Sequence, residues 1–183
     1  MSNENLQLYG WSEELFRQKQ NSTYKNFTHG RVTVTHRTCY EVVAESGFFT
    51  CELTGNMLYG KESSEYPCTG DWVLFQPIDA DKGIIIDMLP RQKALYRLKS
   101  GTVSERQAIA SFIDKAFIVQ SLDDNFNVRR IERFVLQTAD EGIQPVLVLT
   151  KTDLGFDKEE TEKALKHISC KMPVFYTSTE SLE

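Results

Sequence analysis

The stretch that decides the fold of the second half of the chain is Pro145-Val146-Leu147-Val148-Leu149, followed directly by Thr150-Lys151-Thr152-Asp153. A continuous apolar run of this length is typical of a strand that is buried on both faces of a parallel sheet. The polar loop comes at the carboxyl end of the strand, which is where open α/β sheets bind their ligands. The stretch therefore predicts an α/β unit with a ligand-binding loop at residues 150–153.

The chemistry of this loop suits guanine. The two oxygens of the Asp153 carboxylate can accept both adjacent donors of the guanine edge, the ring N–H and the exocyclic amine, which adenine does not present. The methylenes of Lys151 can cover the face of the base. The candidate guanine-binding residues of the loop are Thr150, Lys151, Thr152 and Asp153. The alternative is a loop that only caps the following helix, since a four-residue pattern often recurs by chance.

The segments around this loop alternate between strand and helix patterns. Residues 116–119 form a second continuous apolar run, which predicts another strand buried on both faces. Apolar residues recur with helical period across 127–141, and Gly142 stands where a helix C-cap belongs. A charged helix pattern at 158–167 precedes a third strand pattern at 173–176. The β-α-β-α-β order predicts a parallel sheet.

The first half of the chain alternates with period two instead. Apolar and polar residues alternate at 31–35, 40–44 and 49–53, and two short apolar runs follow at 72–75 and 84–86, with no helix pattern between them. Five strands within about 60 residues fit a small OB-fold barrel. We therefore expect an all-β unit before the α/β unit.

These patterns divide the chain into four parts. Residues 1–29 form an N-terminal extension with one short helix, for which Ser12 can serve as the N-cap. The other parts are the barrel at 30–90, a basic linker at 91–103, and the start of the α/β domain at 104–183.

The charge balance limits where RNA could bind. The chain has 21 Lys and Arg against 26 Asp and Glu, a net charge of −5, whereas nucleic-acid-binding domains usually carry a basic excess. Any RNA-binding surface must therefore be local. The densest basic stretch supplies the candidate residues Arg91, Lys93, Arg97 and Lys99. A solvated linker explains the same stretch nearly as well.

Several other kinds of protein are disfavoured by the sequence. No run of about 18 apolar residues could span a membrane, and residues 1–11 lack the pattern of a secretory signal. The four cysteines have no C-x-x-C pairing and no histidine at metal-ligand spacing: Cys39, Cys51, Cys68 and Cys170. We expect reduced thiols in a cytoplasmic protein, with no metal site in this chain.

One stretch imitates a phosphate-binding loop. Residues 55–61 match G-x-x-x-x-G-K, but Glu62 stands where a Ser or Thr must bind Mg²⁺. A carboxylate there would face the phosphates, and residues 63–67 cannot form the helix whose N-terminus cradles an anion. We interpret the stretch as a surface loop of the barrel.

Some conspicuous side chains have both a functional and a structural interpretation. Trp72 could stack on a base, as aromatic residues of OB-folds do, but packing in the core is favoured. For Arg129, Arg130 and Arg133, internal ion pairs with neighbouring acidic residues are favoured.

Three stretches together have the pattern of one known family. They are Gly70-Asp71-Trp72-Val73 after Tyr66-Pro67, Leu89-Pro90-Arg91 with Arg106-Gln107-Ala108-Ile109-Ala110, and Phe126-Asn127 with Arg133-Phe134. In these the sequence resembles the circularly permuted GTPases that assist maturation of the bacterial small ribosomal subunit, the ribosome small-subunit-dependent GTPase A family. The resemblance covers nearly all of the chain from about Gly30 onward. One departure is Thr150, which stands where the family usually has Asn.

The resemblance implies an OB-fold barrel followed by the first part of a circularly permuted P-loop GTPase domain. In that family the base-recognising loop precedes the phosphate loop, so we expect a chain ending at Glu183 to be an N-terminal piece that holds no catalytic residue and is inactive alone. Ser178 joins the guanine-binding set, because in GTPases the turn after the third strand meets the guanine oxygen. The implied cofactors are GTP or GDP with Mg²⁺, and Zn²⁺ in a C-terminal domain outside this chain.

The resemblance also implies partners, namely the small ribosomal subunit and its rRNA, for a protein expected to be a monomer. The competing hypothesis is an OB-fold RNA-binding module whose α/β half is structural. The two hypotheses differ in whether the gene encodes G-x-x-x-x-G-K-[ST] within about 40 residues after Glu183.

Overall fold

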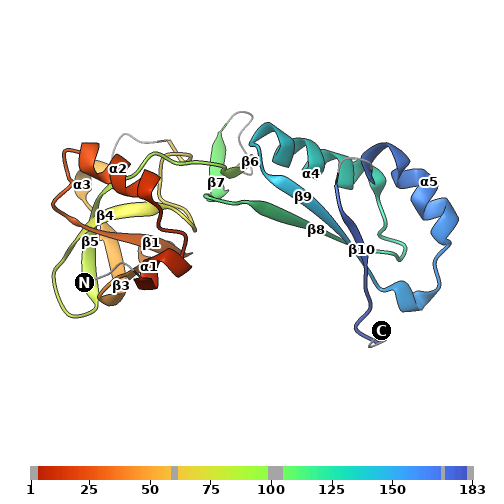
Figure 1. The fold of residues 1–183 in the computed structure, drawn as a ribbon, viewed down its shortest axis with the longest axis horizontal. Coiled ribbons are helices and arrows are strands. Elements are labelled where there is room, and N and C mark those ends of the chain that lie inside the picture. Colours follow the sequence, from red (N-terminus) through yellow and green to blue (C-terminus); the bar gives the residue numbers. More distant parts are fainter. Residues whose placement is uncertain (1–3, 59–61, 99–104, 170–171, 181–183) are drawn as a thin grey trace. The chain divides into compact units, whose positions relative to one another are not determined.

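The computed structural model describes residues 4–58, 62–98, 105–169 and 172–180 (Figure 1). The chain divides into two compact units, Met1–Phe112 and Ile113–Glu183. The first unit contains a closed barrel and the second a parallel sheet with helices. Both predicted fold types, all-β and α/β, are therefore confirmed.

Five strands close into the barrel of the first unit (Figure 1). They are β1 (Thr28–Thr35), β2 (Tyr40–Ala44), β3 (Gly47–Leu53), β4 (Trp72–Pro77) and β5 (Lys82–Met88). The order around the barrel is β1-β2-β3-β5-β4, and β4 pairs back with β1. All neighbouring pairs are antiparallel except β3 and β5. The predicted five-stranded barrel is confirmed.

Apolar side chains from all five strands fill the barrel. Its core includes Val32, Val42, Cys51, Phe75 and Ile85, each at most 1% exposed. A core side chain also packs closely against backbone here, because a Cβ at Gly83 would lie only 2.7 Å from the Phe75 ring.

The described cysteines, Cys39, Cys51 and Cys68, are free thiols, and Cys170 lies outside the described residues. Burial raises the pKa of Cys51 and of Cys68 to about 12, so both thiols are neutral. Among the described residues, no group of three or more His, Cys, Asp or Glu could hold a metal ion. No helix in the same ranges is long and apolar enough to cross a membrane.

The N-terminal extension belongs to the barrel unit. It forms two helices, α1 (Glu4–Leu8) and α2 (Glu13–Asn21), of which the sequence predicted only the second. The Ser12 hydroxyl accepts a hydrogen bond from the backbone N of Leu15 at 3.3 Å, which confirms the predicted N-cap. Trp72 is 1% exposed and packs with residues of this extension, including Leu6, Trp11 and Leu15. The core interpretation of Trp72 is therefore confirmed.

The stretch that imitates a phosphate loop begins with a short helix, α3 (Gly55–Leu58), whereas the sequence predicted a loop. Met57 on this helix is buried in the barrel core. Residues 59–61 lie outside the described part of the chain. In a phosphate loop the helix follows the Gly-Lys pair, whereas α3 precedes it, so the arrangement gives no support for a phosphate site.

The predicted linker, 91–103, is not a plain connection between domains. Its described part contains β6 (Leu95–Leu98), which pairs antiparallel with β7 (Arg106–Ala110) in a two-stranded sheet. An isolated bridge also joins Ala110 to Thr69 beside the barrel. The boundary between the compact units accordingly falls after Phe112, later than the expected boundary at residue 104.

The second unit is a three-stranded parallel sheet with two helices. The strands β8 (Lys115–Ser121), β9 (Gln144–Thr150) and β10 (Val174–Tyr176) lie in the order β10-β9-β8. Along the chain, α4 (Val128–Asp140) follows β8 and α5 (Lys158–Ser169) follows β9. Both strand pairs are parallel, which confirms the predicted β-α-β-α-β order.

The helix α4 ends where Gly142 predicted its C-cap, and it begins after Asn127, an N-cap that was not predicted from the sequence. The Asn127 side chain accepts a hydrogen bond from the backbone N of Arg130 at 3.0 Å, and Gly142 takes a φ of +65° after the last turn. The favoured ion pairs of Arg129, Arg130 and Arg133 do not form among the described residues. This interpretation is therefore corrected, because all three side chains are exposed.

One face of the parallel sheet is open, which corrects the prediction of strands buried on both faces. Both helices pack on the face that carries Ile118, Leu147 and Leu149. On the other face, Phe117 and Val119 of β8 are 66% and 64% exposed. A continuous apolar run indicates that both faces avoid water, but it does not say which elements cover them.

Candidate functional site

The carboxyl ends of the three parallel strands bring three loops together at one edge of the sheet. The backbone N of Leu122, after β8, donates to the carbonyl of Thr150 at 2.9 Å. The backbone N of Thr177, after β10, donates to the carbonyl of Leu149 at 2.9 Å. Because parallel strands end at the same edge, the predicted loop at 150–153 lies between two other loops.

Lys151 has an unusual backbone and a fixed side chain. Its φ of 61° and ψ of 39° are in the left-handed region, where a residue with a Cβ is strained by about 1–2 kcal/mol. Its ammonium Nζ donates to Oδ2 of Asp123 at 2.7 Å. Strained residues persist where the surroundings hold them, and they cluster at ligand sites. The predicted ligand loop is therefore held in one conformation before any ligand binds.

Asp123 was not among the predicted site residues. Its carboxylate also accepts hydrogen bonds from the Ser121 hydroxyl at 2.8 Å and from the backbone N of Asn125 at 3.0 Å. The hydrogen bond from Lys151, followed by those two, holds the pKa of the Asp123 carboxyl well below its usual range. The same pairing raises the pKa of Lys151. The missed signal was positional, because Asp123 follows β8 just as the predicted loop follows β9.

Asp153 and Ser178 meet across the same edge. The Ser178 hydroxyl donates to Oδ1 of Asp153, and itself accepts from the backbone N of Glu180 at 3.0 Å. Oδ2 of Asp153 has no hydrogen bond in the described part of the chain, and the residue is exposed. A carboxylate offers about four lone-pair positions, so the two donors of a guanine edge fit the remaining ones.

The two threonines of the loop contribute through the backbone. The carbonyl of Thr150 accepts the hydrogen bond from Leu122, and the backbone N of Thr152 lies 3.4 Å from the carbonyl of Thr177. Neither side chain makes a hydrogen bond within the described ranges. The structure thus brings all five predicted guanine-binding residues to one edge of the sheet. The side chains of Lys151, Asp153 and Ser178 form hydrogen bonds there.

The predicted RNA-binding residues are not brought together in the same way. Arg91 is largely buried, with a side chain that is 13% exposed, and it forms a double hydrogen bond with Asp71 through Nε at 2.9 Å and Nη2 at 2.5 Å. Burial alone would lower the pKa of Arg91, but the hydrogen bonds and charge of Asp71 raise it. Arg91 is therefore a structural residue, and its assignment to RNA is corrected, because its guanidinium donors are engaged inside the protein.

The carboxylate of Asp71 is the centre of this buried group. It also accepts hydrogen bonds from the Ser111 hydroxyl at 2.5 Å and from the backbone N of Cys68 at 2.8 Å. Gly70 packs so tightly beside it that a Cβ would lie 2.2 Å from the carbonyl of Ser111, and its φ is +98°. Residues from two of the three family-like stretches, Gly70-Asp71 and Arg91, are thus in one hydrogen-bonded group.

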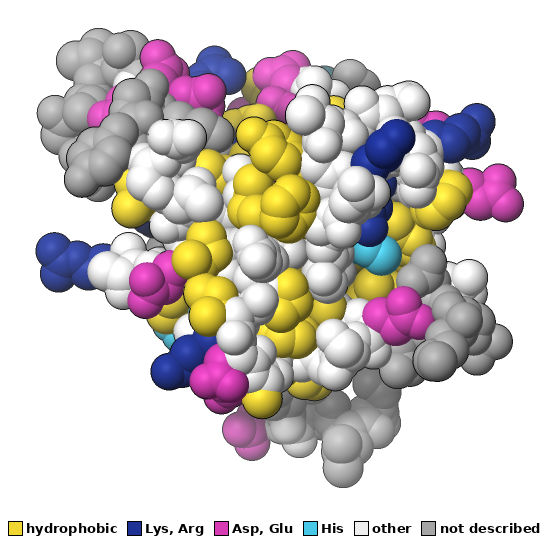
Figure 2. Space-filling model, turned by 90° about the vertical axis from the view of Figure 1, so that its left-hand side faces the viewer, with side chains coloured by type: hydrophobic (Ala, Val, Ile, Leu, Met, Phe, Trp, Pro, Cys, Tyr) yellow, Lys and Arg dark blue, Asp and Glu magenta, His cyan; other side chains and the backbone are white. Residues whose placement is uncertain are grey.

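The other predicted RNA-binding residues are exposed or lie outside the described ranges. Arg97 donates to the side-chain oxygen of Gln107 at 3.1 and 3.3 Å, and Lys93 is exposed with a φ of 44°. Lys99 lies outside the described residues. Figure 2 shows the barrel end of the molecule, where Lys and Arg are scattered among uncharged and hydrophobic side chains. No dense basic patch is visible on that face.

Comparison with known proteins identifies the family. Residues 88–183 match the family described as RsgA GTPase, which is more than half of the chain. The chain belongs to the RsgA GTPase family. The resemblance read from the three sequence stretches is therefore confirmed.

Curated relatives of the RsgA family match most of the chain. "Small ribosomal subunit biogenesis GTPase RsgA 1" of Bacteroides thetaiotaomicron is 67% identical over 180 residues, which cover 97% of this chain and 51% of the relative. "Small ribosomal subunit biogenesis GTPase RsgA 2" of Lactiplantibacillus plantarum is 36% identical over 155 residues, which cover 83% of this chain and 43% of the relative. The chain therefore spans about half the length of these relatives.

Solved structures show the same fold. YjeQ from Thermotoga maritima matches with a TM-score of 0.60 at 21% identity, over 84% of this chain and 52% of that chain. YloQ, described as a circularly permuted GTPase, matches with a TM-score of 0.59 at 22% identity, over 88% of this chain and 55% of that chain. Barrel and parallel sheet therefore recur together in proteins of distant sequence.

Proposed function

We propose that this sequence is the base-recognising half of a GTP-binding and GTP-hydrolysing protein that acts in late maturation of the small ribosomal subunit. The observation that carries the proposal is the edge where Lys151, Asp153 and Ser178 meet. Membership of the RsgA GTPase family supports it, as do the names of the curated relatives.

Guanine selectivity follows from the carboxylate. Asp153 accepts from the ring N–H and the exocyclic amine of guanine, whereas the corresponding edge of adenine carries no such pair of donors. Ser178 holds Oδ1 of Asp153 and so orients the carboxylate. Lys151 is tethered at Nζ by Asp123, which leaves its methylenes to cover the base. Side chains that are already ordered in this way lose less conformational entropy when the ligand binds.

The phosphates require groups that the described residues do not supply. The one stretch with a Gly-Lys pattern has Glu62 at the Mg²⁺ position and its helix on the wrong side. We propose that the phosphate loop, the Mg²⁺ ligands, the switch regions and a Zn²⁺ domain lie in the half of the relatives that this chain does not cover. Mg²⁺ would neutralise the charge that develops on the transferred phosphate.

The exposed apolar face of the parallel sheet also supports the proposal that the rest of the GTPase domain lies outside this chain. Phe117, Val119 and Phe175 are each more than half exposed, and an apolar face of this kind is expected to be covered in a stable protein. We propose that the remainder of the GTPase domain packs there. Residues 1–183 alone are therefore expected to hydrolyse no GTP and to bind it feebly.

The proposed partner is the small ribosomal subunit, in the cytoplasm, with a monomeric protein binding its rRNA. The relatives' names state small ribosomal subunit biogenesis. Of the four basic residues considered, Lys93, Arg97 and Lys99 remain candidates for phosphate contacts, whereas Arg91 stabilises the fold. Any such contacts would weaken as salt rises.

The experiment is phosphate release from GTP by the longer protein, with and without purified small ribosomal subunits. We expect hydrolysis that increases when subunits are added, and co-sedimentation of the protein with them. Residues 1–183 serve as the inactive control. Absence of GTP hydrolysis in the longer protein under both conditions would contradict the proposal and favour the RNA-binding module with a structural α/β half.

A further inference from the structure

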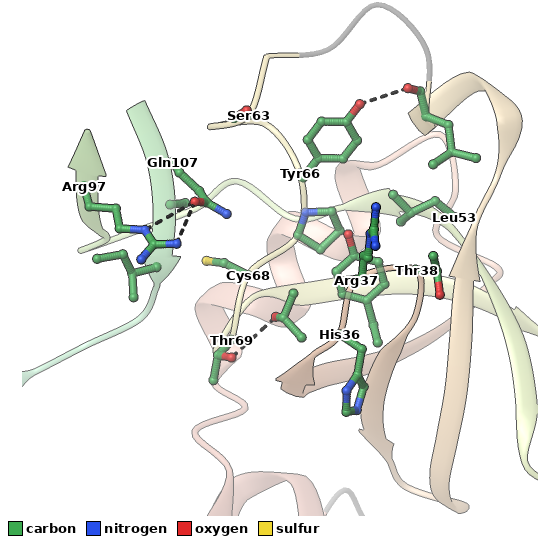
Figure 3. A pocket seen from close by; sticks show the side chains of 16 residues that line it. His36, Arg37, Thr38, Leu53, Ser63, Tyr66, Cys68, Thr69, Arg97 and Gln107 are labelled. Atoms are coloured by element: carbon green, nitrogen blue, oxygen red, sulfur yellow. Dashed lines mark hydrogen bonds between the residues drawn. The ribbon is translucent and has the colours of Figure 1, made fainter. Parts of the chain in front are cut away.

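The first unit contains a cavity of about 720 Å³ that the guanine site does not use (Figure 3). It lies among the β1–β2 loop, the segment before β4 and the β6–β7 hairpin. Ligand-binding cavities for small molecules usually measure roughly 300–1,000 Å³. The cavity therefore has room for a group the size of a nucleotide.

The charged residues that line the cavity are positive. Arg37 and Arg97 line it, and among the described residues no Asp or Glu does, although acidic residues outnumber basic ones in the chain. The exposed guanidinium of Arg37 has no hydrogen bond or ion pair among the described residues. Within the described ranges, the hydrogen bonds of the Arg97 side chain go to the neutral amide of Gln107. The imidazole of His36 is already paired with the carboxylate of Glu41 at 2.8 Å.

The same cavity has a flat apolar wall. The half-buried Tyr66 and the buried Pro67, which follow one another in the sequence, line the cavity together with Leu53, and Figure 3 shows Tyr66 and Leu53. The Tyr66 hydroxyl donates to the carbonyl of Leu58 at 2.9 Å, which fixes the ring. Figure 3 shows the Arg37 side chain between this wall and Leu53. A flat apolar surface beside an unpaired guanidinium suits a base joined to a phosphate.

The wall is held in place by the buried group around Asp71. Arg91 donates to the carbonyl of Ser64 at 2.5 Å and to the carbonyl of Tyr66 at 2.8 Å. The Asp71 carboxylate accepts a hydrogen bond from the backbone N of Cys68 at 2.8 Å. The segment that carries Tyr66 is thus tied down on both sides of the ring. Such a site loses little conformational entropy when a ligand binds.

We propose that this cavity binds one unstacked nucleotide of single-stranded RNA, with the base against Tyr66 and Pro67 and the phosphate at Arg37 and Arg97. The choice of RNA rests on the proposed ribosomal function. A duplex cannot enter, because its bases are stacked and paired, whereas single strands splay bases onto aromatic side chains. A free nucleoside monophosphate has the same chemistry, so the test must separate the two sources.

The test is fluorescence anisotropy of residues 1–183 with a labelled single-stranded RNA oligonucleotide of mixed sequence. Base–aromatic stacking contributes enough that Tyr66→Ala is expected to weaken binding by about tenfold. Arg37→Ala is expected to weaken it by a similar factor and to reduce its salt dependence. Tyr66→Phe, which keeps the ring, should bind within about twofold of the wild type. Arg17→Ala is the matched control. It also removes an arginine, and the Arg17 side chain on α2 is 70% exposed.

Three results would overturn the inference. One is wild-type affinity in both Arg37→Ala and Tyr66→Ala, and another is equal affinity for the strand annealed to its complement. The third is displacement of the labelled strand by free AMP or GMP at matched nucleotide concentration, which would assign the cavity to a free nucleotide. Arg37 has no hydrogen bond or ion pair to lose within the described part of the chain, so Arg37→Ala remains informative even if Tyr66→Ala misfolds. None of these results bears on GTP hydrolysis by the longer protein, so the two proposals fail separately.

Discussion

Two of the carboxylate–cation pairs among the described residues differ in their exposure to solvent. In the barrel unit, the side chains of Asp71 and Arg91 are 2% and 13% exposed. At the edge of the parallel sheet, those of Asp123 and Lys151 are 18% and 53% exposed. Each pair has a short contact, at 2.5 and 2.7 Å respectively, so geometry alone does not separate them. The two pairs are distinguished by how deeply their side chains are buried.

The difference in burial indicates which pair stabilises the fold and which serves a ligand. A buried ion pair leaves an uncompensated charge when one partner is removed, whereas an exposed pair is replaced by water at little cost. Asp71 is surrounded by Arg91, Ser111 and the backbone of Cys68. Lys151 has a single side-chain partner beside open solvent. The first pair should therefore determine the stability of the barrel unit, and the second should determine the conformation of the ligand loop.

The largest expected effect is on the buried pair. Arg91→Ala should destabilise the barrel unit by about 3–5 kcal/mol, because Asp71 would remain buried without its cation. Urea unfolding followed by tryptophan fluorescence isolates this unit, since Trp11 and Trp72 both lie in it and the chain has two tryptophans. Arg97→Ala is the matched control and should change stability by less than about 1 kcal/mol. Equal unfolding midpoints for the two variants would remove the distinction between the pairs.

A second, smaller effect concerns another buried polar group of the barrel unit. The His29 ring lies 4.0 Å from the Trp11 ring, and its Nδ1 lies 3.0 Å from the Lys19 ammonium. Burial, followed by the charge of Lys19, lowers the pKa of His29 from 6.5 to about 4. The unfolded chain therefore takes up a proton below pH 6.5 that the folded chain refuses until about pH 4.

Stability of the barrel unit should accordingly fall as pH drops from 6.5 to about 4. The measurement is the urea midpoint of tryptophan fluorescence across this range. His29→Gln should flatten the dependence, whereas His36→Gln, which changes an exposed imidazole, should keep it. A dependence that persists unchanged in His29→Gln would assign it to other groups.

The comparison also shows what the sequence could predict and why the rest was missed. Period-two runs and apolar stretches predicted the barrel and the parallel sheet, because these patterns depend only on which side chains avoid water. The role of Arg91 was missed because its partner, Asp71, is twenty residues away, and pairing at that distance leaves no local pattern. The β6–β7 hairpin was missed because one of its short strands lies inside a basic run that looks like solvated chain.

The residues of the candidate site were likewise predicted only in part. The loop at 150–153 was found because it follows a strongly apolar strand, and Ser178 was found through the family resemblance. Asp123 was overlooked, although the rule that ligands bind at the carboxyl edge applies equally to the loop after β8. The exposure of Phe117 could not be foreseen, because an apolar run does not identify the element that covers it.

The smallest expected effect is on the exposed pair. Asp123→Ala should shift the unfolding of the second unit less than Arg91→Ala shifts that of the barrel unit, because the Lys151 side chain is 53% exposed. In the longer protein it should weaken GDP binding by about two- to tenfold, since Lys151 must then be ordered by the ligand. The measurement is GDP titration by calorimetry, with Asp124→Ala, an exposed neighbour, as the control. Unchanged GDP affinity would show that the tether at Nζ does not prepare the loop.

The central claim is that Asp153 recognises guanine, and one calorimetric titration tests it most directly. The longer protein and its Asp153→Asn variant are titrated with GDP, XDP and ADP, and Asp124→Asn serves as the matched control. We predict that the wild type binds GDP and not ADP or XDP. The variant should lose GDP and gain XDP, because an amide donor then meets the xanthine carbonyl that replaces the exocyclic amine. Equal affinity of the wild type for ADP and GDP, or a GDP preference that survives in Asp153→Asn, would contradict the account.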